Sequence, residues 1–323
     1  MKIVNSNLKS IYFISRRILT IFKDSPFIHL IKIKNITEII ISMRPKQWYK
    51  NFVLFAGIIF SLNLFHVYMW ITMFLSFVIF CIVSGSEYII NDIMDKEKDK
   101  IHPKKRNRPI ASGKLDTSNA LIFVAIMLCV AFTGAYLVNI KFLGVTLAYF
   151  LLIVSYSLFL KHIVLVDVIT ISLGFVLRAV AGCLAIKVFV SPWLIVCTFL
   201  AALILALGKR KNEVILLENG ATKHRKVLSD YSSEMLDKMM TVVTSTLIMS
   251  YSLYTFLTSN TWMMVTIPLI VYGIFRYTFL VDSKSIGGEP EMLFKDKGIV
   301  TCIVLWTCLT TCIQYSNVLD VLF

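Results

Sequence analysis

Three aspartates stand out in the run NDIMDKEKD at positions 91–99. If the run is helical, a rotation of about 100° per residue places Asp92, Asp95 and Asp99 within a sector of about 60°, with Glu97 on the opposite face. Carboxylate oxygens are the ligands that Mg²⁺ prefers, and Mg²⁺ commonly shares them with substrate phosphates. We therefore predict a Mg²⁺ site formed by the three aspartates. The alternative is a solvated helix end of mixed charge.

A strongly basic loop follows at once, with the sequence IHPKKRNRPIASG at 101–113. Lysine and arginine donate charge-assisted hydrogen bonds to phosphate oxygens, and arginine can do so with two parallel bonds. The loop is therefore predicted to bind phosphate beside the metal, unless its charges serve only to orient the chain in a membrane. Its four cations are Lys104, Lys105, Arg106 and Arg108.

The elements that position these residues are membrane helices. The chain is 57% hydrophobic and 16% charged, whereas soluble domains are about 45–50% apolar. Apolar runs of about 20 residues suit a hydrocarbon core of about 30 Å. We predict an all-α, polytopic bundle of about nine transmembrane helices, at 48–66, 68–90, 119–138, 142–160, 163–186, 191–208, 241–258, 262–281 and 298–316. The first of these is shortened by Asn63 and His66.

The loop charges predict how the bundle is oriented. Nearly all of the 33 Lys and Arg residues lie in the N-terminal arm and in alternate loops, while the opposite loops hold only Lys141 and Lys187. By the positive-inside rule, the N-terminus and the active-site loops are cytoplasmic, in the inner (plasma) membrane. Residues 1–42 are expected to form a basic amphipathic arm at the interface, and 43–323 the nine-helix catalytic domain.

Other ionisable residues lie in or close to the predicted helices. Arg178 is inside the fifth helix, eleven residues after Asp167, and intramembrane ionisable residues are functional candidates by default. We expect Arg178 to bind an anionic substrate or to stabilise the site, with a structural pair as the alternative. Further candidates for substrate binding lie at helix ends and in loops. They are Lys46, Tyr156, Lys161, Lys209, Arg210, Glu213, Arg225 and Lys226.

The sequence lacks the motifs of zinc sites and of nucleotide-binding loops found in soluble proteins. The seven cysteines lie in apolar segments without zinc-like spacing, and no GxxxxGK[ST] loop is present. A transporter would line a path at the membrane midplane with its charges, whereas these gather on one side. We expect no nucleic-acid partner, and leave a homo-oligomer open.

The stretch NDIMDKEKDKIHPKKRNRPIASG resembles the first signature of the UbiA-type intramembrane prenyltransferase superfamily, whose members are nine-helix bundles with Mg²⁺-diphosphate chemistry. Further stretches are similar to its decaprenyl-phosphate phosphoribosyltransferase branch. The loop after the sixth helix departs from the aromatic prenyltransferases, because it has no DxxxD motif. The similar stretches are RPKQWYKN (44–51), SYSLFLKH (155–162), GKRKNE (208–213), HRKVLSDYS (224–232) and FLVDSKSIGGEPEMLFKDKGI (279–299).

The resemblance implies Mg²⁺-dependent transfer of 5-phosphoribose from 5-phosphoribosyl 1-diphosphate to a decaprenyl-type polyprenyl phosphate, with release of pyrophosphate, in envelope biosynthesis. Asp92, Asp95 and Arg178 would be catalytic. The alternative is transfer of a prenyl group from a prenyl diphosphate to an aromatic or glycerol-phosphate acceptor. The substrates would be bound by Asn91, the four cations of the basic loop and the residues of the helix ends and loops named above.

Overall fold

A computed structural model describes residues 36–103, 105–218, 230–258, 260–283 and 295–322. The described residues form helices and no strand, so the predicted all-α class is confirmed. In chain order the elements are α3 (Ile36–Ser42), η2 (Pro45–Phe55), α4 (Ala56–Phe60), α5 (Val67–Met94), α6 (Lys96–Ile101), η3 (Lys105–Asn107), α7 (Thr117–Val138), α8 (Ile140–Leu158), η4 (Leu160–His162), α9 (Val166–Ala185), α10 (Pro192–Glu218), α11 (Ser233–Leu257), η6 (Thr261–Thr266), α12 (Ile267–Asp282) and α13 (Lys297–Leu322).

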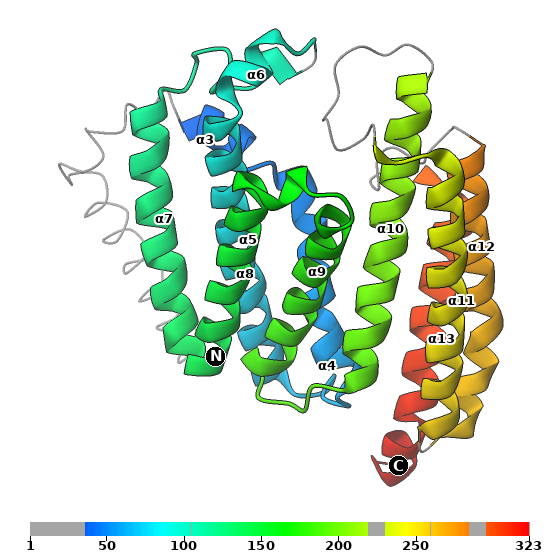
Figure 1. The fold of residues 1–323 in the computed structure, drawn as a ribbon. Helices are drawn as coiled ribbons and strands as arrows, with labels where there is room; N and C mark the ends of the chain where they lie inside the picture. The colour runs from blue at the N-terminus through cyan, green and yellow to red at the C-terminus, as the bar shows by residue number, and fades with distance from the viewer. Residues whose placement is uncertain (1–35, 104, 219–229, 259, 284–294, 323) are drawn as a thin grey trace, which may run out of the picture. The chain divides into compact units, whose positions relative to one another are not determined.

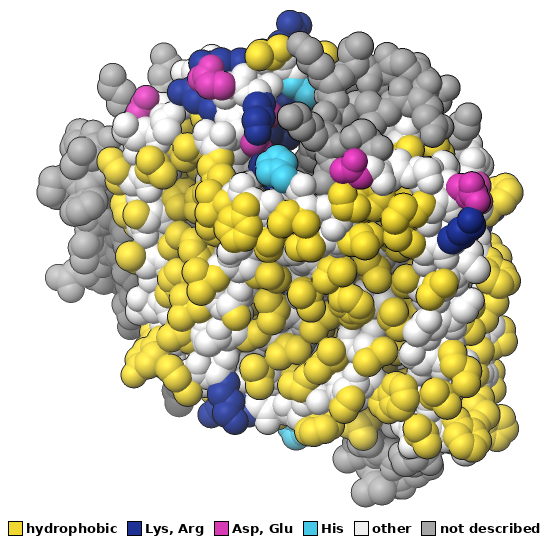
Figure 2. All heavy atoms as spheres, viewed as in Figure 1, with side chains coloured by type: hydrophobic (Ala, Val, Ile, Leu, Met, Phe, Trp, Pro, Cys, Tyr) yellow, Lys and Arg dark blue, Asp and Glu magenta, His cyan; other side chains and the backbone are white. Residues whose placement is uncertain are grey.

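Eight helical segments in the described residues are long and apolar enough to cross a membrane. They correspond to the predicted spans from 68–90 onward, and the chain is a multi-pass membrane protein. Figure 2 shows that hydrophobic side chains cover most of the described part of the face in view, and that few charged side chains interrupt them. Side chains that would face water in a soluble protein here face lipid.

The first predicted span, 48–66, differs from the expected α-helix. It consists of the 3₁₀ helix η2 and the short α4, and it ends at Leu62, whose φ of 61° is left-handed. A 3₁₀ helix rises about 2.0 Å per residue and an α-helix about 1.5 Å. The two pieces together are therefore roughly 30 Å long, which matches the hydrocarbon core.

The chain divides into two compact units, which we describe separately. Within the described part, the first unit comprises 36–46 and 84–128, and the second comprises 47–83 and 129–322. In the second unit α9 contacts α4, α8 and α10, α10 contacts α11, and α12 contacts α13 (Figure 1). The predicted division into an arm of 1–42 and a domain of 43–323 stays a prediction, and residues 1–35 lie outside the described part.

Small residues let two backbones touch inside the second unit. A Cβ atom on Gly182 of α9 would stand 2.0 Å from the carbonyl oxygen of Leu54, and one on Gly57 would stand 2.8 Å from the nitrogen of Cys183. Glycine at such contacts allows membrane helices to approach closely. The backbone of α9 therefore packs directly against η2 and α4.

Candidate functional site

The aspartate segment lies at a break between two helices. α5 ends at Met94, and Asp95 precedes α6 with φ −91° and ψ 7°. Asp95 still donates its backbone N–H to Asn91, and Asp99 donates to Asp95. Asp92 and Asp99 are buried, whereas Asp95 is half-buried. The single continuous helix assumed from the sequence is therefore wrong at Asp95.

Two buried carboxylates converge on one guanidinium group. Arg108 Nη1 lies 3.1 Å from Asp92 Oδ1 and 2.6 Å from Asp99 Oδ2. Arg44 also donates to Asp92 Oδ1. Arg44 was not among the residues selected from the sequence, although it opens the stretch RPKQWYKN. The selected neighbour Lys46 is exposed.

The carboxylate pair has the chemistry of a site for a divalent cation. Arg108 already places a positive nitrogen between Asp92 and Asp99. Mg²⁺ usually takes one or two protein carboxylates and completes its shell with water and substrate phosphates. The pair fits this pattern, but no group of three His, Cys, Asp or Glu residues suited to one metal occurs in the described part of the chain. Asp95 as a third ligand stays a prediction.

The basic loop begins beside this pair. Lys105 and Arg106 of η3 are exposed, Arg108 is partly buried, and Lys104 lies outside the described residues. Backbone bonds from Arg106 to His102 and from Arg108 to Lys105 shape the turn. The loop thus presents two cations to solvent and directs a third toward the aspartates.

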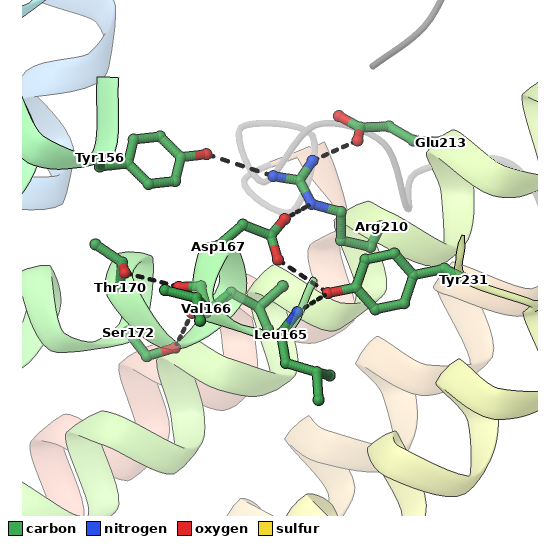
Figure 3. A network of polar contacts seen from close by, with 10 residues as sticks. Tyr156, Leu165, Val166, Asp167, Thr170, Ser172, Arg210, Glu213 and Tyr231 are labelled. Carbon is green, nitrogen blue, oxygen red and sulfur yellow. Dashed lines mark hydrogen bonds and ion pairs between the residues drawn. The ribbon is translucent and has the colours of Figure 1, made fainter. Parts of the chain in front are cut away.

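A second polar network lies in the second unit, at the start of α9 (Figure 3). The fully buried Asp167 accepts hydrogen bonds from Arg210 Nε at 2.7 Å and from the Tyr231 hydroxyl at 2.9 Å. Arg210 also pairs with Glu213 and lies 3.4 Å from the Tyr156 hydroxyl. The structure thus brings together the selected residues Tyr156, Arg210 and Glu213.

Tyr231 was missed, although it lies in the stretch HRKVLSDYS. Its hydroxyl accepts the backbone N–H of Leu165 at 2.7 Å and donates to Asp167. Burial raises the pKa of Tyr231 to about 12, and the bond to Asp167 adds to this. The hydroxyl therefore stays protonated and holds the start of α9 to the segment before α11.

The charge of Arg210 is compensated within the protein. Two carboxylates, Asp167 and Glu213, pair with its one guanidinium. A buried ion pair is weak evidence for added stability, but loss of one partner is costly. Arg210 therefore organises the network, and the role predicted for it in phosphate binding stays a prediction.

A third ionic cluster joins three helices at the same end of the second unit. Lys211 of α10 is buried and pairs with Asp237 of α11 and Asp282 of α12. We call it the Lys211 cluster. The neighbouring candidate Lys209 is half-buried, Lys161 is buried, and Arg225 and Lys226 lie outside the described residues.

Arg178 lies in a cage of neutral groups. Its guanidinium donates to Asn51 Oδ1 at 2.9 Å, to the Gly174 carbonyl at 3.1 Å and to the Tyr149 hydroxyl at 2.5 Å. It also lies over the rings of Tyr149 and Phe175. It forms no ion pair with a carboxylate of the described residues. Its observed contacts join η2, α8 and α9.

Comparison with known proteins gives consistent results. Residues 52–294 match the UbiA prenyltransferase family. A decaprenyl-phosphate phosphoribosyltransferase of Corynebacterium glutamicum is 31% identical over 84% of this chain and 86% of its own length. One from Mycolicibacterium smegmatis is 28% identical over 84% and 90%.

Solved structures show the same fold. A UbiA homolog from Archaeoglobus fulgidus, bound to GPP and Mg²⁺, has a TM-score of 0.66 at 19% identity, over 86% of this chain and 98% of that one. The family match covers well over half of the chain. The protein therefore belongs to the UbiA prenyltransferase family, and it is a transferase.

Proposed function

We propose that this protein transfers 5-phosphoribose from 5-phosphoribosyl 1-diphosphate to a polyprenyl phosphate and releases pyrophosphate. The observation that carries the proposal is the convergence of Asp92 and Asp99 on one cationic nitrogen. It occurs in a chain whose relatives, over most of its length, are named decaprenyl-phosphate phosphoribosyltransferases. Mg²⁺ that binds substrate phosphates is usually held by one or two protein carboxylates, which this pair can supply.

The reaction breaks the bond between the anomeric carbon and the diphosphate oxygen, which keeps the electron pair. A phosphate oxygen of the lipid forms the new bond to that carbon. This nucleophile is already anionic, so no general base is needed. Bound Mg²⁺ supplies neutralisation of the leaving diphosphate. Asp92 and Asp99 would hold it, with Asp95 as the third predicted ligand.

The remaining charged residues have separate proposed roles. The exposed Lys105 and Arg106 would bind donor phosphate through charge-assisted bonds, as would Arg108 once released from the aspartates. The Asp167, Arg210 and Glu213 network would fix the end of α10. The catalytic role of Arg178 stays a prediction, because its contacts are to neutral groups of the protein. Further proposed substrate contacts are Lys46, Asn91, Lys104, Tyr156, Lys161, Lys209, Arg225 and Lys226.

We propose that the lipid chain lies in a cavity of the second unit. A cavity of about 720 Å³ lies among α4, α10, α11, α12 and α13. Its lining includes Phe60, Trp193, Leu247 and Trp306, and it contains no Lys, Arg, His, Asp or Glu. A cavity of this composition suits the hydrocarbon of a polyprenyl chain. We propose that the protein lies in the plasma membrane with its N-terminus in the cytoplasm.

A prenyl transfer reaction is the second candidate, because the family match is to prenyltransferases. The test uses purified protein with Mg²⁺ in two mixtures. One contains labelled 5-phosphoribosyl 1-diphosphate and polyprenyl phosphate, and the other contains labelled prenyl diphosphate and aromatic or glycerol-phosphate acceptors. A lipid-extractable, phosphoribose-labelled product in the first mixture alone supports the proposal. A prenylated product in the second alone replaces it.

A further inference from the structure

We infer that Arg44 and Arg108 are resident counter-cations of the metal site, and that they make binding of the divalent cation depend on binding of a diphosphate. In the structure the two guanidinium groups pair with Asp92 and Asp99. A metal ion must displace them, and a diphosphate gives them new partners. This inference rests on the proposed function for the identity of the anion.

The two buried carboxylates are already compensated by arginines of the protein. Asp92 is 2% exposed and Asp99 is 3% exposed. Buried carboxylates without a compensating charge are costly. Two arginines face these two carboxylates, so the formal charges of the group cancel without metal. A divalent cation added to this group would leave an excess of two positive charges.

Arg44 is held against Asp92 in an unusual backbone conformation. Its φ of 51° lies in the left-handed region, which residues other than glycine rarely adopt. The guanidinium lies 4.8 Å from the centre of the Tyr88 ring while it donates to Asp92. Strained backbone persists where surrounding contacts fix it, and it concentrates at functional sites. The strain at Arg44 accompanies the contact that fills the carboxylate site.

The two arginines are more exposed to solvent than the carboxylates with which they pair. The Arg44 side chain is 27% exposed and that of Arg108 is 25% exposed. Both can therefore reach an anion that approaches from solvent, while the carboxylates stay buried. Guanidinium groups bind phosphate at least as well as carboxylate, with paired hydrogen bonds. Metal and diphosphate then stabilise each other's binding, and the coupling must be equal in both directions.

The test measures binding without turnover. Mn²⁺ serves as the probe, followed by electron paramagnetic resonance on the full-length protein in lipid nanodiscs, with and without methylenediphosphonate. In the wild type the diphosphonate should tighten Mn²⁺ binding by roughly 5- to 150-fold. Arg44→Gln should bind Mn²⁺ alone more tightly than the wild type and gain less from the diphosphonate. Asp92→Asn should remove the coupled signal, which assigns it to this site.

The matched control is Lys100→Gln, which removes one positive charge from the same segment. Lys100 pairs with Glu97 and not with the buried aspartates. It should leave Mn²⁺ affinity and the coupling unchanged. Arg108→Gln provides a second variant with the same expectation as Arg44→Gln, should the latter not fold.

Two results would overturn the inference. One is an Mn²⁺ affinity that does not rise in either arginine variant, and the other is no effect of the diphosphonate on the wild type. The proposed function fails differently, through the absence of phosphoribosylated lipid in the activity assay. Since the binding experiment contains neither lipid phosphate nor a donor that can react, the two failures are distinguishable.

Discussion

Replacement of Asp167 by asparagine tests whether its buried pair with Arg210 organises the end of α10. Loss of one partner from a buried ion pair costs about 3–5 kcal/mol. Asparagine keeps one oxygen that can accept a hydrogen bond, worth about 1 kcal/mol, and Glu213 still faces Arg210. We therefore expect the free energy of unfolding to fall by about 2–3 kcal/mol.

Thermal unfolding of the detergent-purified protein, followed by intrinsic tryptophan fluorescence, measures this loss. For a chain of 323 residues, it corresponds to a decrease in Tm of roughly 3–5 °C, at about 2.1 cal/mol/K of unfolding entropy per residue. Glu213→Gln is the matched control, because it removes the other carboxylate from the same guanidinium. The Glu213 side chain is 23% exposed, so water screens its charge and the cost should be about 1 kcal/mol or less.

The double variant Asp167→Asn with Arg210→Gln completes the cycle. It removes both charges of the buried pair, so its loss of stability should be smaller than the sum of the losses in Asp167→Asn and Arg210→Gln, each of which leaves one buried partner of the pair behind. Equal decreases in Tm for Asp167→Asn and Glu213→Gln would refute the argument from burial. A double variant whose loss of stability equals the sum of the losses in Asp167→Asn and Arg210→Gln would also refute it.

Three further predictions concern packing, pH and metal. Gly182→Ala should prevent accumulation of folded protein, because its Cβ would stand 2.0 Å from a backbone oxygen, whereas Gly144→Ala, with open space around it, should be neutral in the same expression and size-exclusion assay. The raised pKa of Tyr231, about 12, implies stability that is full below about pH 10 and lost as pH rises toward 12, so Tyr231→Phe should lose less Tm between about pH 9 and about pH 11. Asp92→Asn should lower turnover by orders of magnitude and Glu97→Gln only mildly in the labelled-product assay, and equal losses would argue against metal binding by Asp92.

Most of the bundle follows from hydrophobicity alone. Eight apolar runs predicted eight long helices, because a bilayer leaves few other ways to satisfy the backbone. The 48–66 segment was predicted as an α-helix, but its first part is a 3₁₀ helix, and hydropathy does not distinguish the two. Its greater rise per residue compensates for the short apolar run.

The site could be predicted less completely than the fold. The aspartates and the basic loop are close in sequence, so local patterns identify them. Arg44 and Tyr231 are distant from their partners Asp92 and Asp167, and only the tertiary structure brings each pair together. The helix break at Asp95 was missed because periodicity assumes a regular helix through a polar run.

The Lys211 cluster lies at one end of three helices that line the apolar cavity. It ties α10, α11 and α12 together at one end, through Asp237 and Asp282. The cavity lies between the opposite halves of these helices, where the lining is apolar. The ion pairs hold these ends together, so we expect any widening of the cavity to occur at the opposite halves of the three helices. If a lipid chain enters the cavity as proposed, we expect the three helices to separate at their apolar halves while their ends at Lys211 stay together.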